Sequence, residues 1–463
     1  MRGPASTTSR PPRWREVFAG ARGRLTAGLL LLEALVATQI LVVATVMPAV
    51  REELGGLALY GWTFSAAGLG QFAAIPLAGH AVDRFGARRL LAVTLVVYSV
   101  GLLLAALAPS MLALVLARLI QGVGGGAVYA VSLATVAKSY PEALRARVLA
   151  LLAAMWILPG LLGPPLGAVL VATVGWRWAF VAPLPLLVLA AVLAFPALRD
   201  TAGVRERRIA MGPPLVLALG AGALLAGLTM RPSPASLGLI AGGLLLGVPA
   251  LARIVPPGTF AARAGLPAAA AAAFLLSMSF GAADSFATLM LRAVNRRSLA
   301  EAGAVLAATT VAWSLGSWWQ SRAVARHRIS RLVLLGTAMV VVGLAAAATA
   351  LLHLPLALSY AGWIVAGIGM GIAFPTIPLS VMNVAAAGQE ASELSATLLM
   401  DTLGWAMGAG FGGAVIALAE TVGAELRVGI GGSFGIGLLA ALVLLAIARR
   451  LPEPPPSPVD SAT

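Results

Sequence analysis

Residues 79–89 read GHAVDRFGARR, a charged stretch between two long apolar ones. The apolar stretches on its two sides cover residues 57–80 and 89–108. Each is long enough for a helix to cross the ~30 Å hydrocarbon core of a bilayer, which takes ~20 apolar residues. The stretch therefore predicts a short polar loop between two membrane-spanning helices.

The polar side chains of this loop suggest a conformational role. Asp83 can accept hydrogen bonds from the N-terminus of a neighbouring helix, or pair with one of the nearby arginines. Gly86 supplies a turn, and Gly79 is expected to let the helix end pack closely. The remaining charges of the loop are Arg84, Arg88 and Arg89. The alternative interpretation is a charged turn with no further role.

Composition extends the membrane interpretation to the whole chain. Of its 463 residues, 60% are hydrophobic and 11% are charged, and the mean hydropathy is +0.95. About a quarter of the residues in a soluble domain are charged. We therefore expect lipid to be the main solvent.

The same composition excludes several classes of chemistry. The chain has no cysteine, so it has no disulfide, thiolate metal site or cysteine nucleophile. Its three histidines are far apart and lack ligand spacing. The single lysine, Lys138, follows Ala137 rather than the glycine of a phosphate-binding loop, so ATP hydrolysis is not expected. We expect no enzyme activity, no metal and no cofactor.

Fourteen apolar segments are long enough to be spans. They cover residues 25–48, 57–80, 89–108, 110–135, 146–173, 177–197, 211–230, 235–255, 265–291, 301–321, 331–352, 356–382, 392–418 and 430–448. In a twelve-span alternative, residues 211–255 form a buried or re-entrant pair. The number of spans is then still even, so the predicted orientation is the same.

The distribution of positive charge predicts the orientation. With the N-terminus in the cytoplasm, 24 of the 32 Lys and Arg residues lie on the inner side, seven lie on the outer side, and Arg118 lies within a span. Both termini are therefore expected in the cytoplasm. An outer cluster of Arg292, Arg296 and Arg297 departs from this pattern. The net charge of +15 favours the anionic inner leaflet of a plasma (inner) membrane as a partner, rather than nucleic acid.

Two motifs identify a family resemblance. The stretch 79–89 matches every fixed position of Gly-x-x-x-Asp-Arg/Lys-x-Gly-x-Arg-Arg/Lys, a motif of the major facilitator superfamily. The fourth span carries Arg118, Gln121 and Gly122, which resemble the Arg-x-x-Gln-Gly motif of that family. The resemblance covers about residues 25–450. It implies an all-α membrane protein with two pseudo-symmetric six-helix bundles, here with two extra linker helices.

The resemblance also implies a domain organisation. A basic N-tail (1–24) precedes an N-terminal bundle (25–198), a linker with two additional spans (199–263), a C-terminal bundle (264–450) and a disordered tail (451–463). We expect the two additional spans to lie beside the bundles, outside the transport path, and we expect a monomer.

The fifth span carries a motif typical of exporters. Its sequence LPGLLGPPLG resembles the Gly-Pro motif of the exporter branches, in which small residues permit close helix contact and proline kinks the helix. The residues are Gly160, Gly163, Pro164, Pro165 and Gly167. Plain helix packing is the alternative interpretation.

After the fifth span, Trp176-Arg177-Trp178-Ala179-Phe180 resembles a signature of the fourteen-span drug:proton antiporters. An interfacial aromatic belt is an equal alternative. The first span departs from these relatives, because Gln39 stands where they carry an Asp nine residues before Pro48. The acid of this span is instead Glu33, ~9 Å closer to the cytoplasm.

Three carboxylates lie well inside spans: Glu33, Asp284 and Asp401. A charged acid costs ~2.5–3.5 kcal/mol at the centre of a bilayer, so it faces a wet cavity, pairs with a cation or takes up a proton. We expect Glu33 and Asp284 to line a central cavity, and Glu33 to form a switchable pair with Arg118. The alternatives are helix-to-helix locks and, for Asp401, packing against a Ser or Thr.

The remaining polar and aromatic residues within spans complete the candidate cavity. They are Gln39, Gln121, Trp156, Trp313 and Trp405. The tryptophans can stack on a flat lipophilic cation, although positions in the core or facing lipid are more common for such residues.

The function predicted from these features is proton-coupled export of amphipathic, lipophilic or cationic small molecules by alternating access. Export of an endogenous metabolite or lipid through the same fold is a close alternative. A membrane receptor or scaffold that transports nothing is an alternative from another class.

Overall fold

The computed structural model describes residues 14–198, 212–384 and 390–453, and within these ranges every regular element is a helix. Two sequence predictions, the tip of the N-tail and the disordered tail after Glu453, lie outside the described residues. Leu451 and Pro452, which the prediction assigned to that tail, are buried. We call the end of the bundle at which the first long helix begins the inner end, and the opposite end the outer end.

The N-terminal half contains the first six spans. Its elements are α1 (Trp14–Val17), α2 (Gly20–Leu54), η1 (Leu57–Leu59), α3 (Tyr60–Phe85), α4 (Ala87–Ala106), α5 (Met111–Ser139), α6 (Glu142–Ala154), α7 (Ile157–Thr173), α8 (Trp178–Val181), α9 (Pro183–Ala194) and η2 (Phe195–Ala197). The fifth predicted span is divided into α6 and α7, and the sixth into α8, α9 and η2.

The rest of the chain contains the two additional spans and the C-terminal half. Its elements are α10 (Gly212–Thr229), α11 (Pro234–Ile254), η3 (Thr259–Ala261), α12 (Leu266–Leu289), the π-helical turn η4 (Met290–Val294), α13 (Leu299–Ala323), α14 (Ile329–Ala348), η5 (Thr349–Leu352), α15 (Leu356–Met382), α16 (Glu390–Thr421), α17 (Leu426–Ile447) and η6 (Ala448–Arg450).

These helices have the dimensions of membrane spans. By length and composition, thirteen segments of the described chain can cross a membrane. The one predicted span outside these thirteen is the second, residues 57–80, which corresponds to α3, a 26-residue helix that packs between α5 and α16. The prediction of an all-α membrane protein with two halves and two extra helices is confirmed.

Small residues allow the helices within a half to approach closely. Gly122 and Gly126 of α5 face the α3 backbone at Ala67 and Gln71, where a Cβ atom would overlap the chain. Spans in lipid associate through such close contacts, because lipid provides little hydrophobic driving force between helices. This packing places Arg118 and Gln121 on the buried side of α5.

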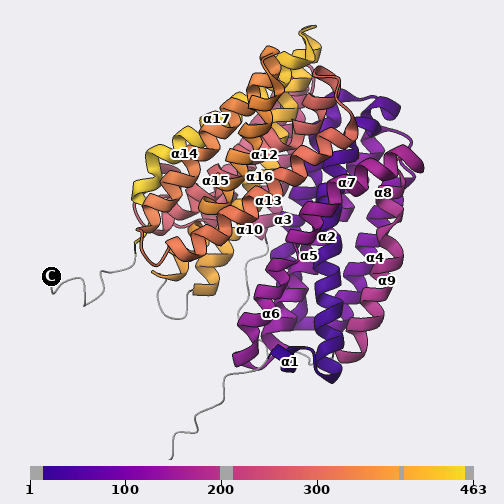
Figure 1. Ribbon diagram of the computed structural model, residues 1–463, viewed down its shortest axis with the longest axis vertical. Coiled ribbons are helices and arrows are strands. Elements are labelled where there is room, and N and C mark those ends of the chain that lie inside the picture. The colour runs from indigo at the N-terminus through magenta and orange to yellow at the C-terminus, as the bar shows by residue number, and fades with distance from the viewer. Residues whose placement is uncertain (1–13, 199–211, 385–389, 454–463) are drawn as a thin grey trace, which may run out of the picture.

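The two halves lie side by side and touch through a limited set of helices (Figure 1). The hydroxyl of Ser65 on α3 donates to the carbonyl of Ala406 on α16 (2.8 Å). The hydroxyl of Thr288 on α12 donates to the carbonyl of Ala44 on α2 (2.7 Å). In Figure 1 the halves are joined toward the outer end and diverge toward the inner end, where α1 and α6 lie.

Helix α10, the first of the two additional spans, lies against both halves. That these spans lie beside the bundles, outside the transport path, stays a prediction. Helix α10 contacts both α3 and α16, across the seam between the halves. The indole of Trp62 donates to the Thr229 hydroxyl (3.0 Å), and the buried Leu225 fills the space left by Gly410 beside Ser65. Helix α10 therefore belongs to the contact between the halves, and α11 packs on α10.

Candidate functional site

Glu33 lies on the buried side of α2, with 4% of its surface exposed. Its carboxylate accepts a hydrogen bond from the indole of Trp156 (3.0 Å). Trp156 stands at the break between α6 and α7, so the broken fifth span presents a donor that a continuous helix could not place in the same way. This hydrogen bond holds the carboxylate of Glu33 in place but does not neutralise its charge.

Asp401 of α16 is the second interior acid, and it accepts a hydrogen bond from the hydroxyl of Ser277 on α12. The contact with a Ser that the sequence offered as an alternative for Asp401 is thus present. Two helices hold this acid, α12 and α16, and both belong to the C-terminal half.

The register between the halves places these two acids at one depth. Thr288 is bonded to Ala44, and Ser277 and Glu33 each precede that contact by eleven residues, or ~16 Å at 1.5 Å per residue. The phenol of Tyr129, on α5, lies within electrostatic range of both Glu33 and Asp401. The interior thus holds one acid from each half, with Tyr129 near both.

Asp284 occupies a different level. It precedes Thr288 by four residues and so lies ~10 Å nearer the outer end than Glu33. It is half-buried and has no hydrogen-bond partner among the residues that the structure describes. The acid that matches Glu33 in depth is therefore Asp401, whereas the sequence analysis had matched Glu33 with Asp284.

Arg118 is held by α3 and by its own helix. Its Nε donates to the carbonyl of Thr63 (3.1 Å) and its guanidinium donates to Oε1 of Gln121 (2.6 Å). The amide of Gln121 in turn reaches the Tyr98 hydroxyl at 3.5 Å. The structure does not bring Arg118 and Glu33 together: the predicted switchable pair is absent from the contacts of the described residues, because each side chain has other partners.

Two of the three predicted tryptophans gather in the C-terminal half. Trp313 and Trp405 pack on Phe280, with ring centroids 5.6 and 5.9 Å away. Trp363 also packs on Phe280 (6.1 Å), and its indole nitrogen is buried without a hydrogen-bond partner. Phe280 precedes Asp284 by one helical turn, so an aromatic cluster lies next to the unpartnered acid.

The sequence analysis missed several residues of this interior, including Tyr129, Phe280, Trp363 and Ser277. Aromatic and hydroxyl residues are common in spans, so only their contacts single these out. The predicted residue Gln39 is buried, and its amide nitrogen has no hydrogen-bond partner.

The exporter-type motif of the fifth span lies against both halves. A Cβ on Gly160 would overlap the side chain of Thr310 on α13, and a Cβ on Gly303 of α13 would crowd Pro164. On the other side of α7, Gly163 and Gly167 face α2 at Leu41 and Thr45. Pro164 and Pro165 lie inside the helix. The small residues thus permit α7 to fit between α2 and α13.

The charged loop between α3 and α4 has a different partner from the predicted ones. Asp83 pairs with Lys138 of α5 (2.6 Å) rather than with Arg88, Arg89 or a helix N-terminus. Gly86 adopts φ 85° and ends α3, as expected for a turn glycine. The packing role predicted for Gly79 is wrong, because a Cβ there would meet nothing within 4 Å.

Other side chains of this loop face outward. The Arg84 guanidinium lies over the Phe85 ring, 5.1 Å from its centroid, and Arg88 and Arg89 are exposed. The loop therefore ties α3 to α5 within the N-terminal half.

The aromatic signature after the fifth span ties down the outer end of α2. The Trp176 indole and the Arg177 guanidinium both donate to Glu53, at 2.7 and 2.5 Å. Arg177 also stacks on Trp176, 4.4 Å from the ring centroid. These contacts connect α8 to α2 in the same half.

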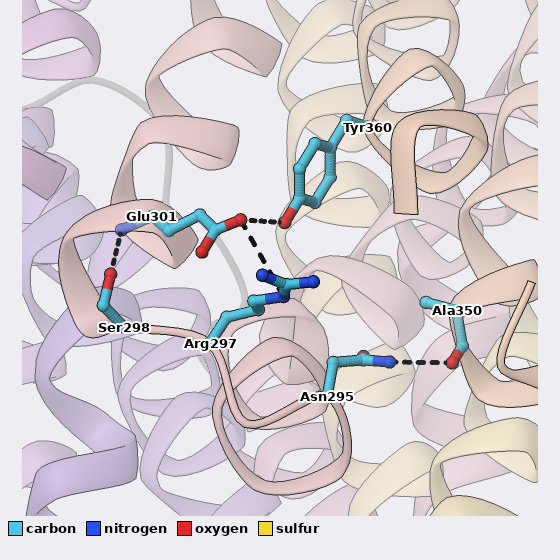
Figure 2. Close-up of polar contacts among 6 residues, drawn as sticks. All are labelled: Asn295, Arg297, Ser298, Glu301, Ala350 and Tyr360. Carbon is cyan, nitrogen blue, oxygen red and sulfur yellow. Dashed lines mark hydrogen bonds and ion pairs between the residues drawn. The ribbon is translucent and has the colours of Figure 1, made fainter. Parts of the chain in front are cut away.

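Two of the three arginines of the outer cluster, Arg292 and Arg297, have acidic partners. Arg292, on η4, pairs with Glu52 of α2 (3.0 Å), which joins the two halves at the outer end. Figure 2 shows the neighbouring contacts: Arg297 approaches Glu301 at 4.0 Å, and the Tyr360 hydroxyl donates to the same carboxylate at 2.5 Å. These pairs explain why arginines stand at an end where the charge distribution predicts few.

Reversing the charge of Arg292 is expected to open the outer end. In Arg292→Glu, two carboxylates replace the pair, and a Cys at Ser65 is expected to react at least threefold faster with an impermeant maleimide. The chain has no native cysteine, so a single thiol reports cleanly. Adding Glu52→Arg to the Arg292→Glu protein restores a pair of opposite charges, and this double variant is expected to label as slowly as the protein with the native pair. Equal labelling rates in all three proteins would show that the ion pair does not hold the outer end.

Comparison with known proteins places the chain in a family. The model of the Major Facilitator Superfamily matches residues 29–409, so the chain belongs to the Major Facilitator Superfamily, a family of membrane transporters.

Its relatives include efflux proteins. A probable multidrug-efflux transporter of Mycobacterium tuberculosis is 27% identical, with 96% of this chain and 99% of the relative covered. A multidrug resistance protein B homolog from the same species is 36% identical over 214 residues, but the match covers 45% of this chain and 39% of that relative.

Solved structures of other transporters share the fold of this chain. A transporter of the POT family aligns with a TM-score of 0.69 at 14% identity, covering 95% of this chain and 98% of that one. A D-xylose-proton symporter aligns with a TM-score of 0.66 at 14% identity, covering 92% and 97%. At such identities the likeness shows the fold alone.

Proposed function

We propose that this chain is a proton-coupled exporter of amphipathic, cationic small molecules that works by alternating access in the plasma (inner) membrane, with both termini in the cytoplasm. The observation that carries the proposal is the pair of interior acids. Glu33 and Asp401 belong to opposite halves, lie at one depth and share Tyr129 as a neighbour. The multidrug-efflux relatives support the same substrate class.

The chemistry of an exchanger follows from the cost of buried charge. A carboxylate in an apolar interior costs ~2.5–3.5 kcal/mol unless a proton or a cation neutralises it. When the interior opens inward, a cationic substrate can replace the proton on Glu33 or Asp401. When it opens outward, a proton can replace the substrate. Each acid therefore holds one or the other.

The aromatic cluster supplies the apolar part of such a site. Trp313, Trp405 and Phe280 present flat rings to a lipophilic ligand, and a cation over such a ring gains ~0.5–2 kcal/mol. Sugars need many hydroxyl and amide partners, which this interior offers sparsely. The ligand class that fits the described residues is thus aromatic or lipophilic with positive charge.

The moving units in this proposal are the two six-helix halves, residues 25–198 and 264–450, with residues 199–263 as the linker. The contacts between the halves at Ser65–Ala406, Thr288–Ala44 and Glu52–Arg292 hold the outer end together. Export requires these contacts to separate while new ones form at the inner end. The close fit of α7 between α2 and α13 provides a surface about which the halves can rock.

Two other functions fit parts of the same observations. Export of an endogenous metabolite or lipid would use the same fold and acids, and among lipophilic cations the described residues favour no single compound. A scaffold that transports nothing would have no use for two buried acids at one depth, which are costly to keep in lipid.

Reconstituted vesicles test the proposal. With the full chain in liposomes and an imposed pH gradient, we expect accumulation of a fluorescent lipophilic cation that collapses when a protonophore is added. Accumulation that continues after the protonophore is added would contradict proton coupling. No accumulation of any member of a cation panel would favour the scaffold, and accumulation of an anionic or lipid probe alone would favour the dedicated exporter.

A further inference from the structure

An apolar groove runs along the membrane-facing side of the C-terminal half, beside the extra hairpin. Residues of four helices line the groove. They are Leu228 of α10, Leu275 and Met278 of α12, and further residues of α16 and α17. Its volume is about 460 Å³, within the range of ~300–1,000 Å³ typical of small-molecule sites. The eleven lining side chains are all apolar, so a polar ligand gains nothing there.

The groove is shorter than a membrane span. Leu275, the lining residue of α12 nearest the inner end, precedes Met278 by three residues. Met278 packs beside Gly408 of α16, and Leu418 lines the groove ten residues beyond Gly408. Thirteen residues of helix span ~20 Å, about two thirds of the ~30 Å hydrocarbon core. A spanning helix of another protein would need the full thickness, whereas an acyl chain that enters from the outer side needs only part of it.

The outer mouth of the groove carries a positive charge. Arg231 follows Leu228 by three residues, just beyond the end of α10, and is exposed. It forms no ion pair or hydrogen bond among the contacts of the described residues. Arg231 lies on the outer side, where the charge distribution predicts few arginines. The phosphate of a lipid headgroup is the group that a guanidinium at this height would meet.

We propose that this groove is a binding site for one phospholipid, with an acyl chain between α10, α12, α16 and α17 and its phosphate at Arg231. Because α10 also contacts both halves at the outer end, through Thr229–Trp62 and Leu225–Gly410, a bound lipid stabilises the closed arrangement of that end. The site is separate from the interior acids and requires no transport activity.

Native mass spectrometry of the full chain in mild detergent tests the site, with phosphatidylglycerol as the probe and diacylglycerol as its analogue without phosphate. The wild-type chain is expected to retain one phosphatidylglycerol in preference to diacylglycerol. Val443→Trp, at a half-exposed lining position, is expected to lower retention at least fivefold. Arg231→Gln is expected to lower it at least threefold and to remove the preference for the phosphate.

Matched controls separate the site from general effects of the substitutions. Leu189→Trp adds the same bulk at an exposed position of α9, and Arg253→Gln removes the same charge from the other end of the hairpin, where Arg253 is exposed. Both are expected to retain lipid like the wild type. Leu418→Trp provides a second filling variant in case Val443→Trp folds poorly.

Wild-type retention in a well-folded Leu418→Trp or Val443→Trp chain would overturn the acyl-chain site. An unchanged phosphate preference in Arg231→Gln would overturn the headgroup assignment. Because lipid retention is measured without substrate or gradient, a failure of the proposed export function leaves this test unaffected.

Discussion

Glu33→Gln is expected to lower proton-driven accumulation of a lipophilic cation at least tenfold. Gln keeps the shape of the side chain and can still accept a hydrogen bond from Trp156, but it can neither carry a proton nor neutralise a cation. The loss should therefore appear in transport that the pH gradient drives. The measurement is initial uptake into vesicles at several imposed gradients.

The matched control is Glu53→Gln, on the same helix. Glu53 is exposed at the outer end and pairs with Arg177, and exposed ion pairs contribute at most ~1 kcal/mol. We expect this variant to transport within twofold of the wild type. Undiminished coupling in Glu33→Gln would assign the proton to Asp401 or Asp284, and the corresponding Asn variants would then distinguish these two acids.

Gly160→Leu is expected to abolish transport, to below about a tenth of the wild-type rate, although both interior acids remain. A Cβ at this position already overlaps the Thr310 side chain on α13. The larger side chain must separate α7 from α13, and small-to-large changes at packed positions cost ~1–3 kcal/mol or more. The halves would then lose the close surface about which they rock.

Gly242→Leu on α11 is the control for this substitution, because a Cβ at Gly242 meets nothing within 4 Å. It is expected to transport normally and to unfold at the wild-type temperature. If Gly160→Leu also transports normally, the α7–α13 contact is not needed for the cycle. Thermal unfolding of both variants separates a folding defect from a blocked transition.

Much of the fold could be predicted from the sequence, because membrane insertion is decided locally. Long apolar segments and the positions of arginine predict spans one segment at a time, and residues 79–89 supply a family motif. The same local signals indicated Glu33, Asp401 and Arg118 as buried polar groups. They could not indicate the partner of each, because partners come from other helices.

The errors of the sequence analysis show where this limit lies. Glu33 was paired with Arg118, but Trp156 is its partner because the fifth span breaks at that residue. Asp83 was assigned to a neighbouring helix N-terminus or to an arginine of its own loop, but Lys138 from α5 reaches it. In both cases the partner lies more than fifty positions away in the chain, and its approach depends on how two helices cross.

The sequence by itself therefore determined that this chain is a helical membrane protein with a few acids inside, since transfer into lipid acts on each segment separately, and its motifs implied the two halves through a family resemblance. The tertiary structure alone decided which acids share a depth, that α10 crosses the seam, and which glycines set the contact between the halves. These properties depend on the register and rotation of packed helices, and in helices that are apolar on nearly every face the residue pattern does not specify either one.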